Sequence, residues 1–173
     1  MKLKFSNEQF DSLFTHLVPN PHLLENAAFA FASFDGQEVL VCQELWLLSE
    51  SDLVVQLPYH IELHDDVRGK VIKRAHDSGL IIVELHSHLG ERPAEFSWSD
   101  LAGFDSWVGH VRWRLKGAPY GAVVITKDSF DGFFWNDGIE RLEAIEAGDQ
   151  NRMNATEKSP TEWTLPEDWY VGH

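Results

Sequence analysis

Residues 80–100 carry the sequence LIIVELHSHLGERPAEFSWSD, which changes from apolar to polar partway along. Its first four residues form an apolar run that is typical of a strand buried on both faces. His86 and His88 follow this run two positions apart, so in a strand they point to the same face about 7 Å apart. One metal ion can bridge two imidazoles at that separation, and neutral imidazole suits zinc well.

A third ligand is available at the start of the helix that we expect next. Gly90 and Pro93 indicate a loop, and Ser97 is placed to be the N-cap residue of that helix. Asp100 would then lie in the first helical turn, facing back toward the strand end, and could supply an oxygen ligand. Two histidines and one carboxylate leave one position open on a tetrahedral zinc, as in catalytic rather than structural zinc sites.

These motifs resemble those of the JAMM family, the zinc metallopeptidases with a JAB/MPN domain, and in particular its prokaryotic JAB branch. The family signature is a distant Glu, then His-Ser/Thr-His-Pro, a short loop and Ser-x-x-Asp. His86-Ser87-His88 and Ser97-x-x-Asp100 match it. The combination of the two motifs is specific, whereas two histidines alone would be a weak signal.

The chain departs from the family pattern at two points. Leu89 stands where the family usually has Pro, and the loop of residues 89–96 is one residue longer than usual. Loop length has a small effect on the free energy of loop closure, so the extra residue is compatible with the site. The resemblance covers roughly residues 20–147 and implies an α/β fold with a mixed β-sheet flanked by helices, the JAB/MPN (cytidine-deaminase-like) fold.

The family's Glu precedes a short apolar strand after the first helix, and Glu25 matches that position. The resemblance implies that Glu25 is the general base, because an unligated carboxylate beside the metal can take a proton from water and pass it to the leaving amine. Without the resemblance, a solvated carboxylate at a strand edge is the simpler interpretation. Glu38, Glu44 and Glu84 stay open as other candidates for the base.

The resemblance also implies the rest of the mechanism. Zn²⁺ is expected on His86, His88 and Asp100, where it would lower the pKa of a water molecule that attacks a peptide or isopeptide carbonyl. Ser97 would donate a hydrogen bond to the developing oxyanion. The alternative for Ser97 is a plain helix cap, and the two roles are compatible.

Family members act after the flexible C-terminal tail of ubiquitin or ubiquitin-like proteins. We therefore expect a zinc-dependent peptidase or isopeptidase acting on a ubiquitin-like or sulfur-carrier-like protein, by deconjugation or precursor processing, possibly with an associated activating enzyme as a further partner. Two alternatives stay open: a non-catalytic scaffold of the MPN type, and a zinc peptidase for small peptide adducts.

A second histidine pattern occurs at His60, Glu62 and His64, which alternate onto one face of an expected strand. Such alternation usually forms the polar side of a half-exposed strand rather than a metal site.

The composition restricts the class of protein. The 173 residues are 43% hydrophobic, enough for the core of one domain. The 14 basic and 28 acidic residues give a formal net charge of −14, which argues against nucleic acid as a partner. No apolar run is long enough for a membrane span or a secretory signal, so we expect a cytoplasmic protein with no membrane partner. Cys42, the single cysteine, excludes an internal disulfide and multi-cysteine zinc sites, and we expect it to be buried and inert.

The pattern of apolar residues predicts the remaining elements. A capping-box motif begins the first expected helix at Ser6, and Gly79 is the expected C-cap of the second. The expected helices cover residues 6–18, 65–78 and 97–115, and the expected strands cover 23–32, 38–48, 53–63, 80–88, 120–126 and 130–135. Residues 139–147 fit a strand or a helix, and the resemblance implies a strand. We take residues 1–147 as the JAB/MPN domain and 148–173 as a partly mobile C-terminal tail whose aromatic end could dock back on the domain.

Overall fold

The computed structural model describes residues 1–18 and 24–163. Predictions for Pro19 to Leu23 and for residues 164–173 therefore lie outside the described residues. The described elements are β1 (Lys2–Phe5), α1 (Asn7–Leu17), β2 (Ala27–Asp35), β3 (Val39–Leu47), a 3-10 turn (Glu50–Asp52), β4 (Leu53–Leu57), β5 (His60–Leu63), α2 (Asp65–Ser78), β6 (Ile81–Ser87), α3 (Trp98–Arg114), β7 (Tyr120–Ile125), β8 (Phe130–Trp135), β9 (Ile139–Arg141), β10 (Ala144–Ala147) and β11 (Gln150–Asn154).

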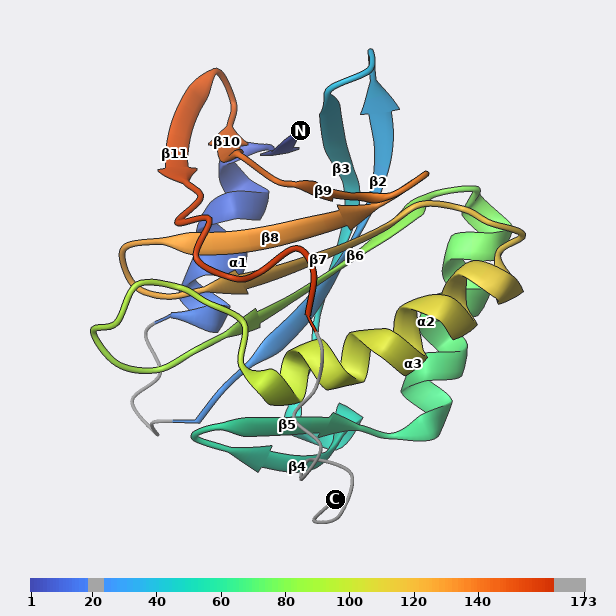
Figure 1. Cartoon of the computed structure of the whole chain (residues 1–173), viewed down its shortest axis with the longest axis horizontal. Coiled ribbons are helices and arrows are strands. Elements are labelled where there is room, and N and C mark those ends of the chain that lie inside the picture. Colours follow the sequence, from blue (N-terminus) through green and yellow to red (C-terminus); the bar gives the residue numbers. More distant parts are fainter. Residues whose placement is uncertain (19–23, 164–173) are drawn as a thin grey trace.

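Nine of these strands form one mixed sheet in the order β11-β10-β1-β3-β2-β6-β7-β8-β9. The pairs β1–β10, β1–β3 and β6–β7 are parallel, and the other neighbours are antiparallel. Strands β4 and β5 form a separate hairpin below the main sheet (Figure 1). The prediction of a mixed α/β fold is therefore confirmed.

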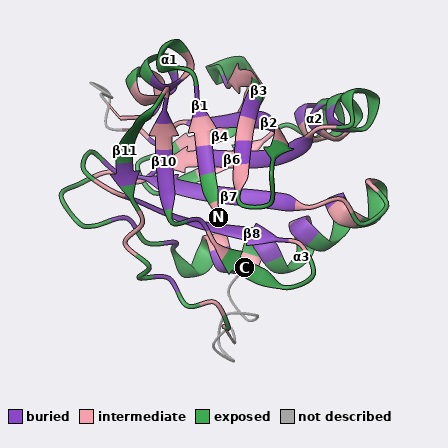
Figure 2. Ribbon diagram, turned by 90° about the horizontal axis from the view of Figure 1, so that it is seen from above, coloured by how far each residue is buried: buried purple, intermediate pink, exposed green. Residues whose placement is uncertain are grey.

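Helices cover both faces of the sheet, and each face has its own apolar core. Helix α1 packs on one face, where the small side chains Ala28, Ala30 and Ala32 of β2 point. Helices α2 and α3 cover the other face, where Phe29 and Phe31 of the same strand point. Strand β2 is thus buried on both sides, as its nearly continuous apolar sequence predicts. Figure 2 shows the buried residues concentrated along the central strands.

The predicted helix ends are confirmed by their caps. The Ser6 hydroxyl accepts a hydrogen bond from the Gln9 amide at 3.1 Å, and the Gln9 side chain accepts one from the Ser6 amide at 2.9 Å. Gly79 ends α2 in the left-handed region with φ of 69°, which costs glycine little. No helix among the described residues has both the length and the apolar character that crossing a membrane requires.

Two short segments of the sheet add to the sequence analysis. Strand β1, which we did not expect, lies between β3 and β10. Residues 139–147 form two strands, β9 and β10, which resolves the choice between strand and helix.

The described residues from 148 onward are more ordered than the expected mobile surface segment, and Trp163 of the aromatic end lies against the domain as expected. Gln150–Asn154 form β11, which pairs with β10 in an antiparallel arrangement. Beyond it, Ser159 is fully buried and Trp163 stacks on Phe133 at 5.9 Å between ring centroids. Polar composition was misleading because these residues obtain their order from the sheet edge and not from a hydrophobic pattern of their own.

Candidate metal centre

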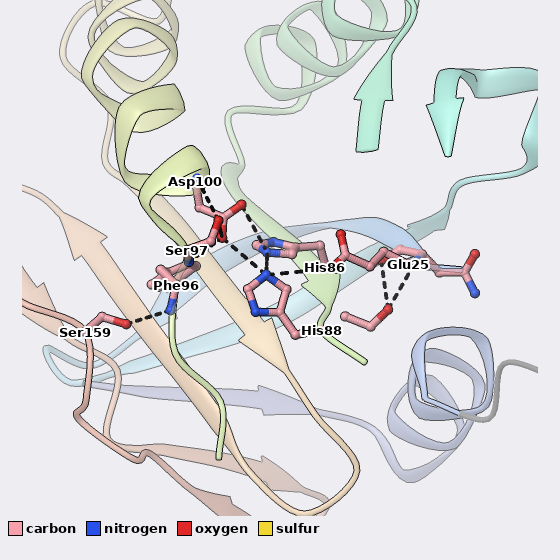
Figure 3. A network of polar contacts seen from close by, with 9 residues as sticks. Glu25, His86, His88, Phe96, Ser97, Asp100 and Ser159 are labelled. Atoms are coloured by element: carbon pink, nitrogen blue, oxygen red, sulfur yellow. Dashed lines mark hydrogen bonds and ion pairs between the residues drawn. The ribbon is translucent and has the colours of Figure 1, made fainter. Parts of the chain in front are cut away.

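Three side chains from two elements converge at one end of β6 (Figure 3). His86 lies in β6, His88 lies just beyond its end, and Asp100 lies in the first turn of α3. The Nε2 atoms of the two histidines are 3.2 Å apart, and Asp100 oxygens lie 3.5 Å from His86 Nε2 and 3.2 Å from His88 Nε2. The three residues each offer one ligand atom within 4.8 Å of the others, so this group could hold a metal ion.

The helix cap places the carboxylate. The Ser97 hydroxyl accepts a hydrogen bond from the Asp100 amide at 3.2 Å, while the Ser97 amide donates one to Asp100 Oδ2 at 2.7 Å. The Ser97 hydroxyl also donates to Asp100 Oδ2 at 2.7 Å. Ser97 therefore caps α3, as the sequence predicts, and at the same time orients the carboxylate toward the histidines.

Glu25 lies beside this group. Its Oε1 is 4.0 Å from His88 Nε2, and the residue is only 6% exposed. The reason is the register of two strands: Ala27 pairs with His86, so the residues just before β2 reach the end of β6 that carries the candidate ligands. The Asn26 amide fixes this approach by donating to Ser87 Oγ at 3.0 Å.

The β4–β5 hairpin holds the backbone of Glu25 from the other side. The Glu25 amide donates to the Leu57 carbonyl at 3.2 Å, and the Gln56 side chain donates to the Glu25 carbonyl at 2.9 Å. Gln56 also donates to Asn26 Oδ1 at 2.7 Å. The carboxylate is therefore directed by backbone contacts on both sides and does not move freely in solvent.

The charges in the site are strongly coupled. Burial alone would lower the pKa of His86, but the Asp100 charge and hydrogen bond, with help from Glu25 and Glu84, raise it to about 9. Burial works against ionisation of Asp100, yet the two histidines hold its pKa well below the usual range. Burial raises the pKa of Glu25, against the opposing effect of the histidines. Two imidazoles around carboxylates form an electrostatic environment in which a divalent cation can replace the histidine protons.

The loop between His88 and α3 is attached to the C-terminal segment. The Phe96 amide donates to Ser159 Oγ at 2.8 Å (Figure 3), and the Ala94 carbonyl accepts a hydrogen bond from Thr156 at 2.6 Å. The Ser159 amide in turn donates to the buried carboxylate of Asp131 at 2.8 Å. The segment after β11 thus supports the loop that carries Ser97 and Asp100.

Two cavities meet at the site. One, of about 440 Å³, extends between β6, α3 and the β4–β5 hairpin, and is lined by Glu25, His86 and Asp100. The other, of about 580 Å³, lies on the His88 side. Glu25 and Tyr59 line both cavities, so the candidate metal centre lies between two spaces that open on either side of it.

The other candidate bases lie in different surroundings. Glu38 is exposed in the turn between β2 and β3, and Glu44 pairs with Arg74. Glu84 lies two residues before His86, lines the smaller cavity and accepts a hydrogen bond from the Tyr120 hydroxyl. Among the four carboxylates, only Glu25 is within 4.0 Å of a candidate ligand nitrogen by the ion-pair distances of the described residues.

The His60, Glu62 and His64 set is not a metal group in this structure. All three residues are exposed, on β5 and at the start of α2. The described residues contain one group of ligating side chains close enough to hold an ion, and it is His86, His88 and Asp100.

Sequence reasoning did not identify three residues that support the site. Gln56 and Ser159 hold it through contacts that are distant in sequence, and no local pattern signals them. Arg68 lines the smaller cavity, and its position near the start of an expected helix was a sequence signal that could have pointed to it. A cation in the first turn of a helix opposes the helix dipole, so its presence in α2 indicates a role beyond helix formation.

Comparisons with known proteins show the fold and leave the activity open. No protein-family model matches the chain, and no curated protein matches it. The solution structure of protein DSY2949 from Desulfitobacterium hafniense is similar, with a TM-score of 0.50 and 12% sequence identity, and the alignment covers 94% of this chain and 99% of that one. At this identity the similarity concerns the fold alone.

Proposed function

We propose that this chain is a zinc-dependent peptidase or isopeptidase of the JAB/MPN type, acting after the C-terminal tail of a ubiquitin-like or sulfur-carrier-like protein. The observation that carries the proposal is the distance of 4.0 Å between the buried Glu25 carboxylate and His88 Nε2, beside the His86, His88 and Asp100 group. A ligand set with a separate carboxylate next to it is the arrangement that metal-assisted hydrolysis requires.

The donor atoms fit zinc. Two imidazole nitrogens and one carboxylate oxygen are ligands that Zn²⁺ accepts, and they leave a position open for a catalytic role. His86, His88 and Asp100 would hold the ion. Bound there, Zn²⁺ would supply Lewis acidity, by lowering the pKa of water and polarising a carbonyl group.

The chain's own residues would perform the proton transfers. Burial raises the pKa of Glu25, which brings this carboxylate closer to the range in which a general base also works as a general acid. Glu25 would take a proton from the attacking water and deliver it to the nitrogen of the leaving amine. Ser97, whose hydroxyl is exposed at the helix start, would exchange its hydrogen bond with Asp100 for one to the developing oxyanion.

The cavities would hold the substrate. A peptide chain passing the site would occupy both cavities, with the scissile bond between them, next to Glu25. We further propose a cytoplasmic location and an activating enzyme as an associated partner.

The test uses purified full-length protein and a panel of ubiquitin-like and sulfur-carrier proteins with C-terminal extensions or isopeptide-linked lysine. We expect about one zinc per chain, loss of zinc in His88→Ala, and in Glu25→Gln retention of zinc with at least a hundredfold loss of cleavage. Glu38→Gln, in the turn between β2 and β3, is the matched control and should keep full activity. Cleavage by Glu25→Gln at the wild-type rate, or full zinc retention in His88→Ala, would contradict the proposal.

A further inference from the structure

The smaller cavity contains a cation that has no carboxylate within ion-pair distance among the described residues. Arg68 is the one lysine or arginine among the described residues that line this cavity. Within the described part of the chain, its guanidinium forms no ion pair, although the protein has a net charge of −14. The charge of Arg68 acts on Glu84 in the same cavity, but no ion pair occupies the guanidinium donors, so they are available for an anionic ligand.

Arg68 is held in place by an aromatic and hydrogen-bonded support. Its guanidinium lies over the Trp107 ring, 5.4 Å from the ring centroid. Trp107 is fixed by its indole N–H, which donates to the hydroxyl of Tyr120 at 2.8 Å, and that hydroxyl donates to Glu84. Stacking on an aromatic ring leaves the edge of the guanidinium free, and this edge carries the donors that bind a carboxylate in a bidentate manner.

The cavity connects this arginine to the candidate metal centre. Glu84 and His86 are two residues apart on one face of β6, which separates them by about 7 Å. Glu25, His86, Asp100 and Arg68 all line this one cavity, and the charge of Arg68 acts on Glu84. An extended chain advances about 3.3 Å per residue, so two residues of a bound peptide cover about the separation between His86 and Glu84.

We propose that Arg68 binds the C-terminal carboxylate of the substrate, so that the enzyme removes one or two residues from a C-terminus. This inference rests on the proposed function and narrows its substrate class to precursors or adducts with a free carboxylate. The cavity of about 440 Å³ has room for one or two residues. The substrate chain that precedes the scissile bond then leaves through the larger cavity on the His88 side.

The reaction is a hydrolysis with a defined balance of atoms. Water adds across the scissile amide: its oxygen forms a bond to the carbonyl carbon, and the bond from that carbon to nitrogen breaks. The proton removed by Glu25 goes to the leaving nitrogen. The products are the shortened protein with a new C-terminal carboxylate and a free amino acid or dipeptide, whose own carboxylate is at Arg68.

The charges of the cavity support a carboxylate at this one position. Glu62 and Glu84 also line the cavity and would repel an anion elsewhere in it. One oxygen of Glu84 already accepts a hydrogen bond from the Tyr120 hydroxyl, so this carboxylate has less acceptor capacity left for other partners. A substrate that ends in an amide would lack the carboxylate that matches Arg68. A substrate joined through an isopeptide bond to a lysine side chain of another protein would lack it too.

The test compares two substrates that differ in one group. A ubiquitin-like protein with a two-residue C-terminal extension is prepared with a free carboxylate or with a C-terminal amide. We expect kcat/KM for the acid to exceed that for the amide about tenfold or more, because a charge-assisted bidentate contact is lost in the amide. Arg68→Gln should remove the preference for the free carboxylate by lowering kcat/KM for that substrate, and Arg68→Lys should restore part of the preference. Arg114→Gln, on the exposed end of α3, is the control and should leave the preference unchanged.

A binding measurement in the metal-free protein separates this inference from the proposed function. An N-acetylated dipeptide acid should shift the indole N–H resonance of Trp107, and Arg68→Gln or the dipeptide amide should not. A shift without cleavage would leave the carboxylate site standing while the peptidase proposal fails. Equal cleavage of acid and amide with no Arg68 dependence, or faster cleavage of isopeptide-linked lysine, would overturn the carboxylate site alone.

Discussion

The Phe96 amide donates a hydrogen bond of 2.8 Å to the hydroxyl of Ser159. This contact joins the loop between His88 and α3 to the segment after β11. Both residues are buried, Phe96 at 4% and Ser159 at 0% exposure. The Phe96 ring also lies near His86, at 6.0 Å between ring centroids. The C-terminal segment is therefore part of the support of the site.

Ser159→Ala should consequently weaken both the fold and the site. The substitution leaves the buried Phe96 amide without its acceptor, which costs about 1–3 kcal/mol in the free energy of unfolding. Zinc affinity should fall about tenfold because the loop that carries Asp100 loses an anchor. Chemical denaturation and a zinc titration measure the two effects, with Ser12→Ala on the exposed face of α1 as control. Unchanged stability and affinity would show that this contact does not support the site.

Metal binding should depend on pH through His86. In the metal-free protein its pKa is raised from 6.5 to about 9, chiefly by Asp100 acting against the effect of burial. The group thus contributes stability below pH 6.5 that is lost as pH rises through about 9. Zinc must displace this proton, so zinc affinity should rise about tenfold per pH unit below that pKa.

Calorimetry in buffers of different ionisation enthalpy measures the released protons. We expect at least one proton per zinc at pH 7.5, and His76→Ala, an exposed histidine of α2, should give the same value. Zinc affinity that is constant with pH between 6.5 and 9 would contradict the coupling between His86 and Asp100.

Gln56 should act as a positioning residue for Glu25. Its side chain donates to the Glu25 carbonyl at 2.9 Å and to Asn26 Oδ1 at 2.7 Å. Gln56→Ala should lower kcat about tenfold with zinc content unchanged, because misplacement of the base weakens proton transfer and not metal binding. It should also shift the acidic limb of the pH–rate profile, which a purely structural role would not do. Gln43→Ala, an exposed glutamine of β3, is the control, and zinc loss in Gln56→Ala would contradict this role.

Cys42 should be unreactive in the folded protein. It is 5% exposed, and burial raises the pKa of its thiol to about 12. Since the thiolate is the reactive form, a disulfide reagent at pH 8 should label Cys42 only as fast as the protein unfolds. Labelling at the rate of a free thiol, without denaturant, would contradict the burial.

The three residues of the candidate metal centre were predictable from sequence because local geometry brings them together. The spacing of His86 and His88 matches the two-residue repeat of a strand, and the cap at Ser97 places Asp100 in the first turn of α3. Glu25 was expected only from the resemblance to the JAMM family. Its position depends on the pairing of β2 with β6, which no local pattern specifies.

The strands that sequence analysis missed obtain their order from pairing with neighbouring strands of the sheet. Strand β1 is four residues long and is stabilised by β3 and β10 on either side. Strand β11 contains one buried apolar residue, Met153, so its sequence resembles a surface segment. The pairing of β1 with β10 joins residues more than a hundred positions apart, and β11 forms by pairing with the adjacent β10. Neither strand has an apolar pattern of its own that would predict this pairing.

One metal ion should bind at His86, His88 and Asp100. Anomalous diffraction at the zinc absorption edge, from crystals of the zinc-loaded protein, locates the ion. We expect one peak per chain, within about 2.0–2.2 Å of both Nε2 atoms and of an Asp100 oxygen. Stoichiometric zinc bound elsewhere, for instance at His60, Glu62 and His64, with no peak at the three predicted ligands, would contradict it.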